Sequence, residues 1–199
     1  MKSIDLIIIG AGPGGYDTAV YAAEHGLDTV IVESAEVGGT CLNHGCIPTK
    51  CFVHDADLIR NSMSTCNGKC IVDFSQIQAR KDTVVRQLRQ GIETLLSRPG
   101  ITLVRGKARF LDAHTISIND EEYSAKNIII ATGSHSKLPQ FAVEGMKSAK
   151  TKVVTSTELL NITYVPERLA IVGAGVIGME FASVFNAFGS HVEVYEFLK

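Results

Sequence analysis

A strand, a glycine-rich turn, a helix and a second strand ending in a glutamate follow one another at the start of this 199-residue chain. Ile4–Ile9 is an almost continuous apolar run with many β-branched residues, which predicts a strand buried on both faces. The alanine-rich stretch 13–25 predicts a helix that Gly26 closes. Thr29–Val32 predicts the next strand, directly before Glu33. This order of elements indicates an α/β fold.

The spacing of the glycines in this unit predicts a dinucleotide site. Gly10, Gly12 and Gly15 form the pattern G-x-G-x-x-G between the strand and the helix. A pyrophosphate needs a tight turn at the first glycine, close backbone approach at the second and tight helix packing at the third. It then lies on the helix N-terminus, while an acid such as Glu33 accepts from a ribose hydroxyl. A plain glycine-rich turn is the alternative, which the strand, helix and acid disfavour.

The whole unit occurs a second time near the end of the chain. Its predicted parts are a strand at 168–172, the glycines Gly173, Gly175 and Gly178, a helix to about Phe188, and a strand at 191–195 that ends at Glu196. This repeat predicts two Rossmann-like units and two bound dinucleotides, with a purely structural second unit as the alternative. Glu196 would accept from an unmodified ribose and repel a 2′-phosphate, so it favours NAD over NADP.

Two cysteines lie five positions apart between these units, in the stretch 38–50. A disulfide between Cys41 and Cys46 requires the backbone between them to depart from a regular helix, and Gly45 permits that departure. The chain can run as a helix beyond Pro48, and Lys50 would then lie one turn past Cys46 on the same face. A thiolate at a helix N-terminus is stabilised by the dipole and by nearby cations. Two buried structural cysteines, or half of a zinc site, are the other interpretations of these residues.

The segments between the two units have weaker patterns. Periodic apolar residues predict a long amphipathic helix over 75–97, after a loop at 61–68. Short strands are predicted at 101–105, 108–111, 115–118, 123–124 and 127–130. A connector at 136–152 precedes a short helix near 155–160, capped by Thr155 or Ser156.

The composition limits the partners of the chain. A formal net charge of −2 gives no reason to expect nucleic acid or an anionic membrane, and the apolar runs are too short to span a bilayer. Five cysteines without a secretory signal predict a reducing cytoplasm, where a disulfide is more often catalytic than structural. Cys51, Cys66 and Cys70 are interpreted as incidental, and no metal site is expected.

The stretch 38–50 resembles the redox-active disulfide motif of the flavin-dependent pyridine nucleotide-disulfide oxidoreductases. That family includes dihydrolipoamide dehydrogenase, glutathione reductase and mercuric reductase. The resemblance implies that Cys46 lies against the flavin, that Cys41 exchanges with substrate, and that Lys50 stabilises anionic charge on the flavin and pairs with Glu180. Val176 stands where several relatives carry a tyrosine that gates the nicotinamide pocket, so that gate is expected to be missing.

The resemblance also implies a wider set of cofactor residues and a small antiparallel meander over 101–130. For FAD they are Gly10, Gly12, Pro13, Gly14, Gly15, Glu33, Ser34, Gly39, Thr40, Cys41, Cys46, Lys50, Lys107, Ala108, Ala131, Thr132 and Gly133. For NAD they are Gly173, Gly175, Val176, Ile177, Gly178 and Glu196.

The resemblance further implies an FAD domain over 1–148 and the first part of an NAD domain over 149–199. In relatives the chain continues, returns to the flavin domain and adds a dimerisation domain with a His–Glu base. We therefore expect an N-terminal piece of a homodimeric, dihydrolipoamide dehydrogenase-like enzyme that is inactive by itself. A mercuric-reductase-like or oxidative-stress flavin reductase is the alternative, as is a cofactor-binding module without turnover.

Overall fold

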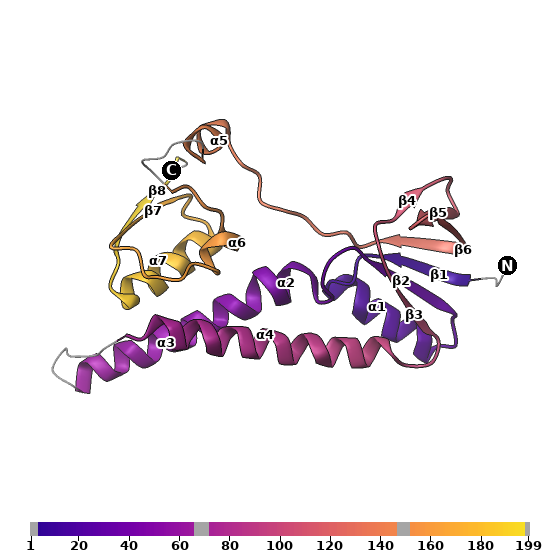
Figure 1. Cartoon of the computed structure of the whole chain (residues 1–199), viewed down its shortest axis with the longest axis horizontal. Coiled ribbons are helices and arrows are strands. Elements are labelled where there is room, and N and C mark those ends of the chain that lie inside the picture. The colour runs from indigo at the N-terminus through magenta and orange to yellow at the C-terminus, as the bar shows by residue number, and fades with distance from the viewer. Residues whose placement is uncertain (1–3, 66–71, 147–151, 198–199) are drawn as a thin grey trace. The chain divides into compact units, whose positions relative to one another are not determined.

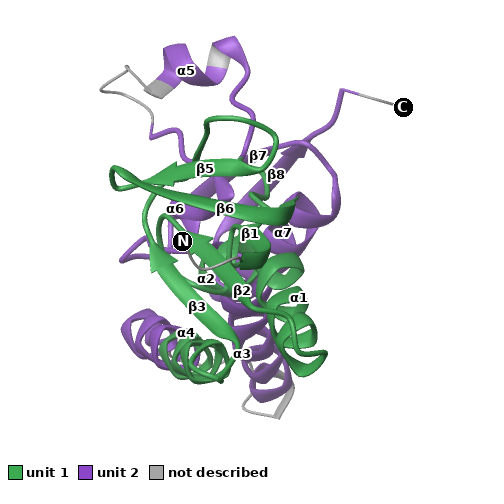
Figure 2. Cartoon of the chain, turned by 90° about the vertical axis from the view of Figure 1, so that its right-hand side faces the viewer, with its two compact units in different colours: residues 1–43, 85–135 green, residues 44–84, 136–199 purple. Residues whose placement is uncertain are grey.

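The computed structural model describes residues 4–65, 72–146 and 152–197, which form two compact units. The first unit comprises residues 1–43 and 85–135, and the second comprises residues 44–84 and 136–199 (Figure 2). From the N-terminus, the elements are β1 (Ile4–Ile9), α1 (Pro13–Glu24), β2 (Thr29–Glu33), α2 (Gly39–His44), α3 (Cys46–Thr65), α4 (Phe74–Leu96), β3 (Ile101–Arg105), β4 (Arg109–Phe110), β5 (Thr115–Ile118), β6 (Glu121–Ile130), α5 (Gln140–Met146), α6 (Ser156–Leu159), β7 (Arg168–Val172), α7 (Val176–Phe188) and β8 (His191–Tyr195) (Figure 1).

The first unit is built on a six-stranded sheet of order β3-β2-β1-β6-β5-β4. The strands β3, β2, β1 and β6 run parallel, and β4, β5 and the start of β6 form the antiparallel meander that the resemblance implies. Because the parallel strands end at one edge, Glu33, the last residue of β2, lies at that edge with Gly10, Gly106 and Ala131, which directly follow β1, β3 and β6. Open α/β sheets bind ligands at this carboxyl edge.

Small residues let α1 lie close to this sheet. The buried residues Gly15, Ala19 and Ala22 recur at helical spacing along one face of α1. The side chain of Ile8 faces Gly15 at this contact. On the other face of β1, Ile7 belongs to a core that includes the isoleucines of β5. β1 is therefore buried on both sides, as its apolar run predicts.

The second unit has a core rich in phenylalanine. Phe52 of α3, Phe74 of α4, and Phe185 and Phe188 of α7 are buried, with ring centroids 5.7–6.5 Å apart, mostly edge to face. Aromatic pairs prefer this geometry. The parallel strands β7 and β8 lie beside α7, and Leu169 packs against the same core. The second glycine turn therefore belongs to a parallel strand–helix–strand unit, as predicted.

Three predicted elements are wrong in extent. Residues 61–65, predicted as part of a loop, continue α3, and the Ser62 hydroxyl donates to the Leu58 carbonyl at 2.8 Å, within the helix. Residues 66–68 of that predicted loop lie outside the described residues. The two strands predicted at 123–130 are one strand, β6, because its first part pairs with β5 and its second part with β1. The predicted connector 136–152 contains α5, which begins directly after Pro139, where a proline suits a helix start.

The predicted boundary between an FAD and an NAD domain at 148/149 falls outside the described residues. The two compact units divide the chain differently, since the second unit includes α3 and the start of α4. Among the helices that the structure describes, none is both long enough and apolar enough to cross a membrane.

Candidate active site

The first glycine turn has a backbone that only glycine can adopt. Gly10 has a φ of +106°, and a Cβ atom there would lie 2.2 Å from the carbonyl oxygen of Ala131. A Cβ atom at Gly15 would lie 1.8 Å from the carbonyl oxygen of Gly10. Both distances are impossible for real atoms, so the turn, the start of α1 and the end of β6 are packed backbone to backbone. This is the arrangement that close approach of a pyrophosphate requires.

The carboxylate of Glu33 closes this turn from the end of β2. It accepts hydrogen bonds from the backbone N–H groups of Ala11 and Ala35, each at 2.8 Å. Gly12 is the N-cap of α1, and among the described residues no side chain caps this end of the helix and no acid lies in its first turn. The N-terminus of α1 therefore presents its partial positive charge without a competing carboxylate in that turn, which fits a phosphate group.

The second turn repeats this geometry. Gly173 has a φ of +105°, and a Cβ atom at Gly178 would lie 2.1 Å from the Gly173 carbonyl oxygen. Gly175 is the N-cap of α7 with φ −70° and ψ 178°, close to the −75° and −176° of its counterpart in the first unit. The carboxylate of Glu196 accepts from the Ala174 N–H at 2.7 Å. The repeat in the sequence is thus a repeat in three dimensions.

The stretch 38–50, which carries the two cysteines, begins in contact with the first glycine turn. Gly38 and Gly39 have φ values of +94° and +56°, and a Cβ atom at Gly39 would lie 2.7 Å from the Cα atom of Gly12. Cys41 follows within α2 and is partly exposed. This contact places the helix that carries Cys41 directly against the start of α1.

A helix break separates the two cysteines, at the glycine that permits a departure from a regular helix. α2 ends at His44 and α3 begins at Cys46, with Gly45 between them. Cys46 is exposed and is the first residue of α3, so its thiol lies at a helix N-terminus. A helix dipole stabilises a thiolate at that end.

Lys50 and Glu180 form an ion pair within the second unit, between α3 and α7. The side chains are 59% and 30% exposed, so a ligand can reach both. The sequence places these two residues far apart, and the structure brings them together.

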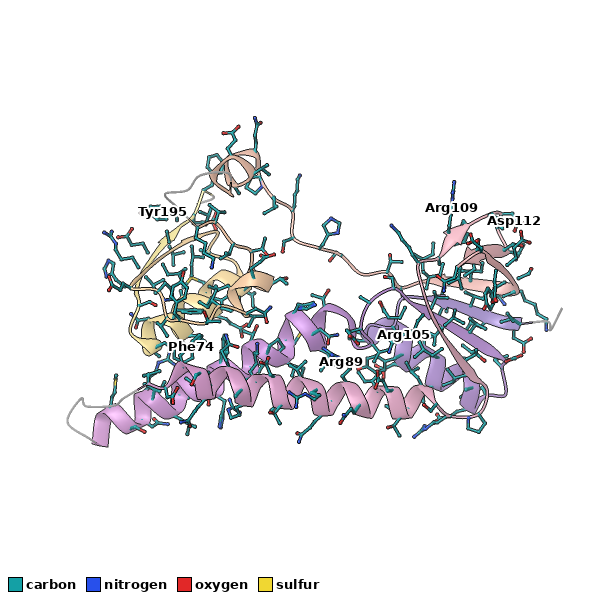
Figure 3. The ribbon with its side chains drawn as sticks, in the orientation of Figure 1. Phe74, Arg89, Arg105, Arg109, Asp112 and Tyr195 are labelled. Carbon is teal, nitrogen blue, oxygen red and sulfur yellow. The ribbon has the colours of Figure 1, made fainter. Side chains whose placement is uncertain are left out.

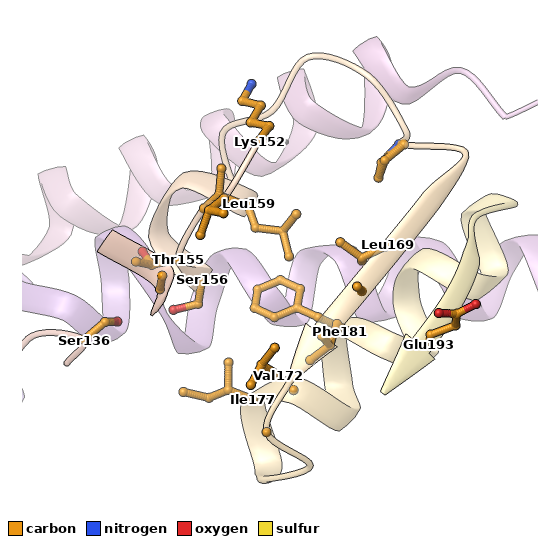
Figure 4. A pocket seen from close by; sticks show the side chains of 18 of the residues that line it. Ser136, Lys152, Thr155, Ser156, Leu159, Leu169, Val172, Ile177, Phe181 and Glu193 are labelled. Carbon is orange, nitrogen blue, oxygen red and sulfur yellow. The ribbon is translucent and has the colours of Figure 1, made fainter. Parts of the chain in front are cut away.

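A cavity of about 1050 Å³ lies within the second unit beside the second glycine turn (Figure 4). Its lining includes Gly173, Gly175 and Ile177 from the turn, Phe181 from α7, Thr155 at the cap of α6, and Glu193 from β8. Ligand pockets have volumes of roughly 300–1,000 Å³. A dinucleotide that lay on the start of α7 would therefore have room beside it.

The other residues predicted to hold cofactors lie near these turns or on the surface. Pro13, Gly14, Ser34, Thr40, Lys107, Thr132, Gly133, Val176 and Ile177 are exposed, and Ala131 is partly buried where it follows β6. Ala108 packs against the core of the first unit. Gly38, Asn43 and Arg89 were not predicted as site residues. Gly106 has a φ of +156° and its N–H donates to the Glu33 carbonyl at 2.9 Å.

Burial raises the pKa of the Cys51 thiol, more than the nearby charges of Arg80 and Lys81 lower it. A buried thiol with a raised pKa is a poor nucleophile, in keeping with an incidental role for Cys51. Cys66 and Cys70 lie outside the described residues. Across the part of the chain that the structure describes, no group of three or more His, Cys, Asp or Glu residues could hold a metal ion.

A family model described as pyridine nucleotide-disulphide oxidoreductase matches residues 4–199. The chain belongs to this family. It is 44% identical to a dihydrolipoyl dehydrogenase of Acholeplasma laidlawii over 99% of its own length and 60% of that relative. It is 39% identical to a dihydrolipoyl dehydrogenase of Chlamydia muridarum over 98% of its own length and 43% of that relative.

The fold is also similar to that of RclA, an HOCl-induced flavoprotein disulfide reductase of Escherichia coli. A Cu(II) complex of RclA matches with a TM-score of 0.82 and 34% identity, over 96% of this chain and 41% of RclA. The chain thus spans between about two fifths and three fifths of these relatives. Members of this oxidoreductase family use FAD and NAD(H), and they act on small-molecule or protein disulfides and dithiols. The resemblance inferred from the dithiol stretch is confirmed.

Proposed function

We propose that this chain is the FAD-binding and dithiol-bearing part of a dihydrolipoyl dehydrogenase-like enzyme that uses NAD. The observation that carries the proposal is the contact of Gly39 with Gly12. It sets the helix of Cys41 against the turn that would hold the flavin nucleotide. A dinucleotide turn alone would suit many oxidoreductases. A cysteine pair that starts at that turn suits one that exchanges electrons with disulfides.

The first unit would hold FAD through the Gly10–Gly15 turn, Glu33 and the backbone after β6, and the second unit would hold NAD through the Gly173–Gly178 turn and Glu196. When bound, these cofactors supply hydride transfer between nicotinamide and flavin. Both turns fit such groups, since their backbones approach closely and glycine caps both helices.

The Cys41–Cys46 pair carries the two electrons to or from the substrate. In the oxidising direction, one thiol of dihydrolipoamide attacks the Cys41–Cys46 disulfide at Cys41 and releases the Cys46 thiolate. The second substrate thiol then attacks the mixed disulfide, releases Cys41 and closes the lipoamide disulfide. The substrate loses two electrons and two protons, and the cysteine pair gains both. Lys50, held by Glu180, would provide the cation that stabilises negative charge near Cys46.

The test is to count thiols with and without a reductant. The oxidised chain is alkylated before and after dithiothreitol, and the modified peptides are assigned by mass spectrometry. We expect two additional alkylations, at Cys41 and Cys46. Cys41→Ser should abolish both gains, whereas Cys51→Ser should leave them unchanged. A gain that persists in Cys41→Ser would overturn the pairing.

An oxidative-stress flavin reductase is the second candidate, supported by the similarity to RclA over 96% of the chain. The relatives named dihydrolipoyl dehydrogenase are 36–44% identical and RclA is 34–35% identical, which favours the first candidate. The discriminating assay compares NADH-dependent reduction of lipoamide and of Cu(II) by a longer protein that contains this chain. Activity with Cu(II) and none with lipoamide would favour the second candidate.

The cellular setting follows from the same chemistry. A lipoamide or other disulfide substrate is the proposed partner, and the longer enzyme is proposed to be a cytoplasmic homodimer. Five cysteines and a catalytic rather than structural disulfide support a reducing compartment. Size-exclusion chromatography with light scattering on that longer enzyme tests the dimer.

A further inference from the structure

The side-chain amide of Asn43, near the end of α2, forms four hydrogen bonds. Its amide nitrogen donates to the carbonyl oxygens of Val37 and Gly39, both at 3.0 Å. Its amide oxygen accepts from the Nε and Nη2 atoms of Arg89, at 3.0 and 2.7 Å. An asparagine amide has two N–H donors and one oxygen with two lone pairs. All four positions are therefore used, and the orientation of the amide is determined.

Arg89, labelled in Figure 3, reaches this amide from α4. Arg89, Asn43, Val37 and Gly39 all belong to the first unit. The side chain of Arg89 is only 29% exposed, and its Nη1 atom lies 3.8 Å from the carboxylate of Glu36. The guanidinium therefore connects α4 to the segment before α2 through Glu36, and to the end of α2 through Asn43. A planar guanidinium can donate from two nitrogens to one acceptor, which a lysine ammonium does not reproduce.

α2 requires such support because it contains only six residues. An isolated helix of that length is unstable in water. Its first end is held by the contact of Gly39 with Gly12 and by the Gly38 N–H, which donates to the Ala11 carbonyl at 2.8 Å. Its last end, next to the Gly45 break, is held by the Asn43–Arg89 hydrogen bonds. Cys41 lies between these two anchors.

We propose that Arg89 is a positioning residue for the dithiol: through Asn43 it holds the end of α2 and thereby the thiol of Cys41. The inference depends on the proposed function of the Cys41–Cys46 pair. Ring closure of a disulfide depends strongly on how its two sulfurs are held, because thiol–disulfide exchange in a preorganised pair is intramolecular. A looser α2 should therefore make the disulfide less stable against reduction.

The test is an equilibrium of residues 1–199 with reduced and oxidised glutathione. After acid quenching and alkylation, peptide mass spectrometry gives the fraction of the Cys41–Cys46 disulfide at each glutathione ratio. Arg89→Met keeps the length of the side chain and removes the donors. The glutathione equilibrium constant gives the effective concentration of one thiol with respect to the other. We expect this effective concentration to fall about tenfold in Arg89→Met, since hydrogen bonds to charged groups contribute strongly. In Arg89→Lys, which keeps the charge without the two-nitrogen geometry, the effective concentration should fall about threefold.

Arg98→Met is the matched control, because Arg98 forms an exposed ion pair with Glu24 in the same unit, away from α2. It should leave the effective concentration within about twofold of the parent, even if the melting temperature falls. A second variant, Asn43→Asp, keeps an acceptor for Arg89 and loses both donors to the carbonyls of Val37 and Gly39. We expect it to weaken the disulfide as Arg89→Met does.

Several outcomes would overturn the inference. An effective concentration in Arg89→Met within twofold of the parent would do so. A fall in Arg98→Met as large as that in Arg89→Met would also do so. If circular dichroism shows that Arg89→Met does not fold, Arg89→Lys decides, and a parent-like value refutes the positioning role. Absence of any Cys41–Cys46 disulfide in the parent would overturn the proposed function and this inference together. If the parent forms the disulfide and the Arg89 variants form it with the same stability, this inference alone is overturned.

Discussion

The carboxylate of Glu33 accepts a hydrogen bond from the backbone N–H of Ala11 at 2.8 Å, across the first glycine turn. Glu196 and Ala174 form the same bond at 2.7 Å across the second turn. In each unit the acid at the end of the second strand therefore also orders the turn that leads into the helix. The two glutamates therefore stabilise the shape of the glycine turns through the backbone.

Glu33→Gln should weaken FAD binding by roughly tenfold, because a charged acceptor of two backbone N–H groups is replaced by a neutral one. Fluorescence titration of the chain with FAD measures this change. Glu24→Gln, an exposed residue of α1 that pairs with Arg98, is the matched control and should bind FAD like the parent. Equal affinity in Glu33→Gln and the parent would show that this carboxylate has no role in the site.

Glu196 should make the second unit prefer NAD to NADP, since a 2′-phosphate would lie against its carboxylate. Like charges at such a contact cost up to several kcal/mol, so we expect a preference of at least tenfold. Isothermal titration with NADH and NADPH gives the ratio. Glu196→Gln should reduce this ratio, and Glu167→Gln should not, because Glu167 is an exposed residue of the same unit that does not line the cavity. Tight binding of NADPH by the parent would contradict the assignment.

Gly39→Ala should destabilise the first unit by about 1–3 kcal/mol, because it requires a strained left-handed alanine whose Cβ would overlap the Cα of Gly12. Urea unfolding followed by circular dichroism measures the free energy of unfolding. Gly91→Ala is the control, because Gly91 lies within α4 and the added Cβ would meet nothing within 4 Å beyond its chain neighbours and the backbone of its own helix. It should stabilise the chain by about 0.5–1 kcal/mol. A neutral Gly39→Ala would disprove the close contact of α2 with the first turn.

The Lys50–Glu180 pair should contribute less than about 1 kcal/mol to stability, because both side chains are partly exposed. A double-mutant cycle with Lys50→Met and Glu180→Gln measures the coupling free energy. In a longer protein that contains this chain, Lys50→Met should nevertheless slow reduction of the enzyme by dihydrolipoamide at least tenfold. A rate of reduction in Lys50→Met equal to that of the unmodified protein would show that the ion pair has no role in the reaction.

The start of α4 should show a defined pH dependence. Asp73 accepts from the Ser75 hydroxyl at 2.6 Å and from the Gln76 N–H at 3.3 Å, and these bonds hold its pKa below 3.8. A lowered folded pKa means that the stabilisation is complete above 3.8 and is lost as the pH falls through the folded value. Asp73→Asn keeps the capping oxygen without the charge. Its melting temperature should therefore lie below that of the parent near neutral pH, and this difference should shrink as the pH falls below 3.8.

Asp120→Asn is the control for that pH series, because Asp120 lies in a turn at φ 66°, which asparagine also adopts readily. Its melting curve should follow the parent across the acid range. If Asp73→Asn loses stability with acid as steeply as the parent, the charge on Asp73 does not contribute to the folded state.

Local chemistry in the sequence determined the two strand–glycine turn–helix–strand units. A side chain at Gly10, Gly15 or Gly178 would overlap backbone atoms, and Gly10 and Gly173 have positive φ values, so the spacing of these glycines reports geometry directly. Gly45, which permits a departure from a regular helix, stands between the end of α2 and the start of α3, and Thr155, one of the two predicted caps, is the N-cap of α6. Each depends on residues within one or two turns of chain.

Only the tertiary structure decided the features that join distant segments. β6 is one strand because β5 and β1 pair with its two parts, which the interrupted apolar pattern of 121–130 does not reveal. Asn43 and Arg89 lie 46 positions apart, and each is an ordinary polar residue in its own helix. Lys50 meets Glu180 across 130 positions. Such contacts depend on how helices pack, so no local pattern of residue types encodes them.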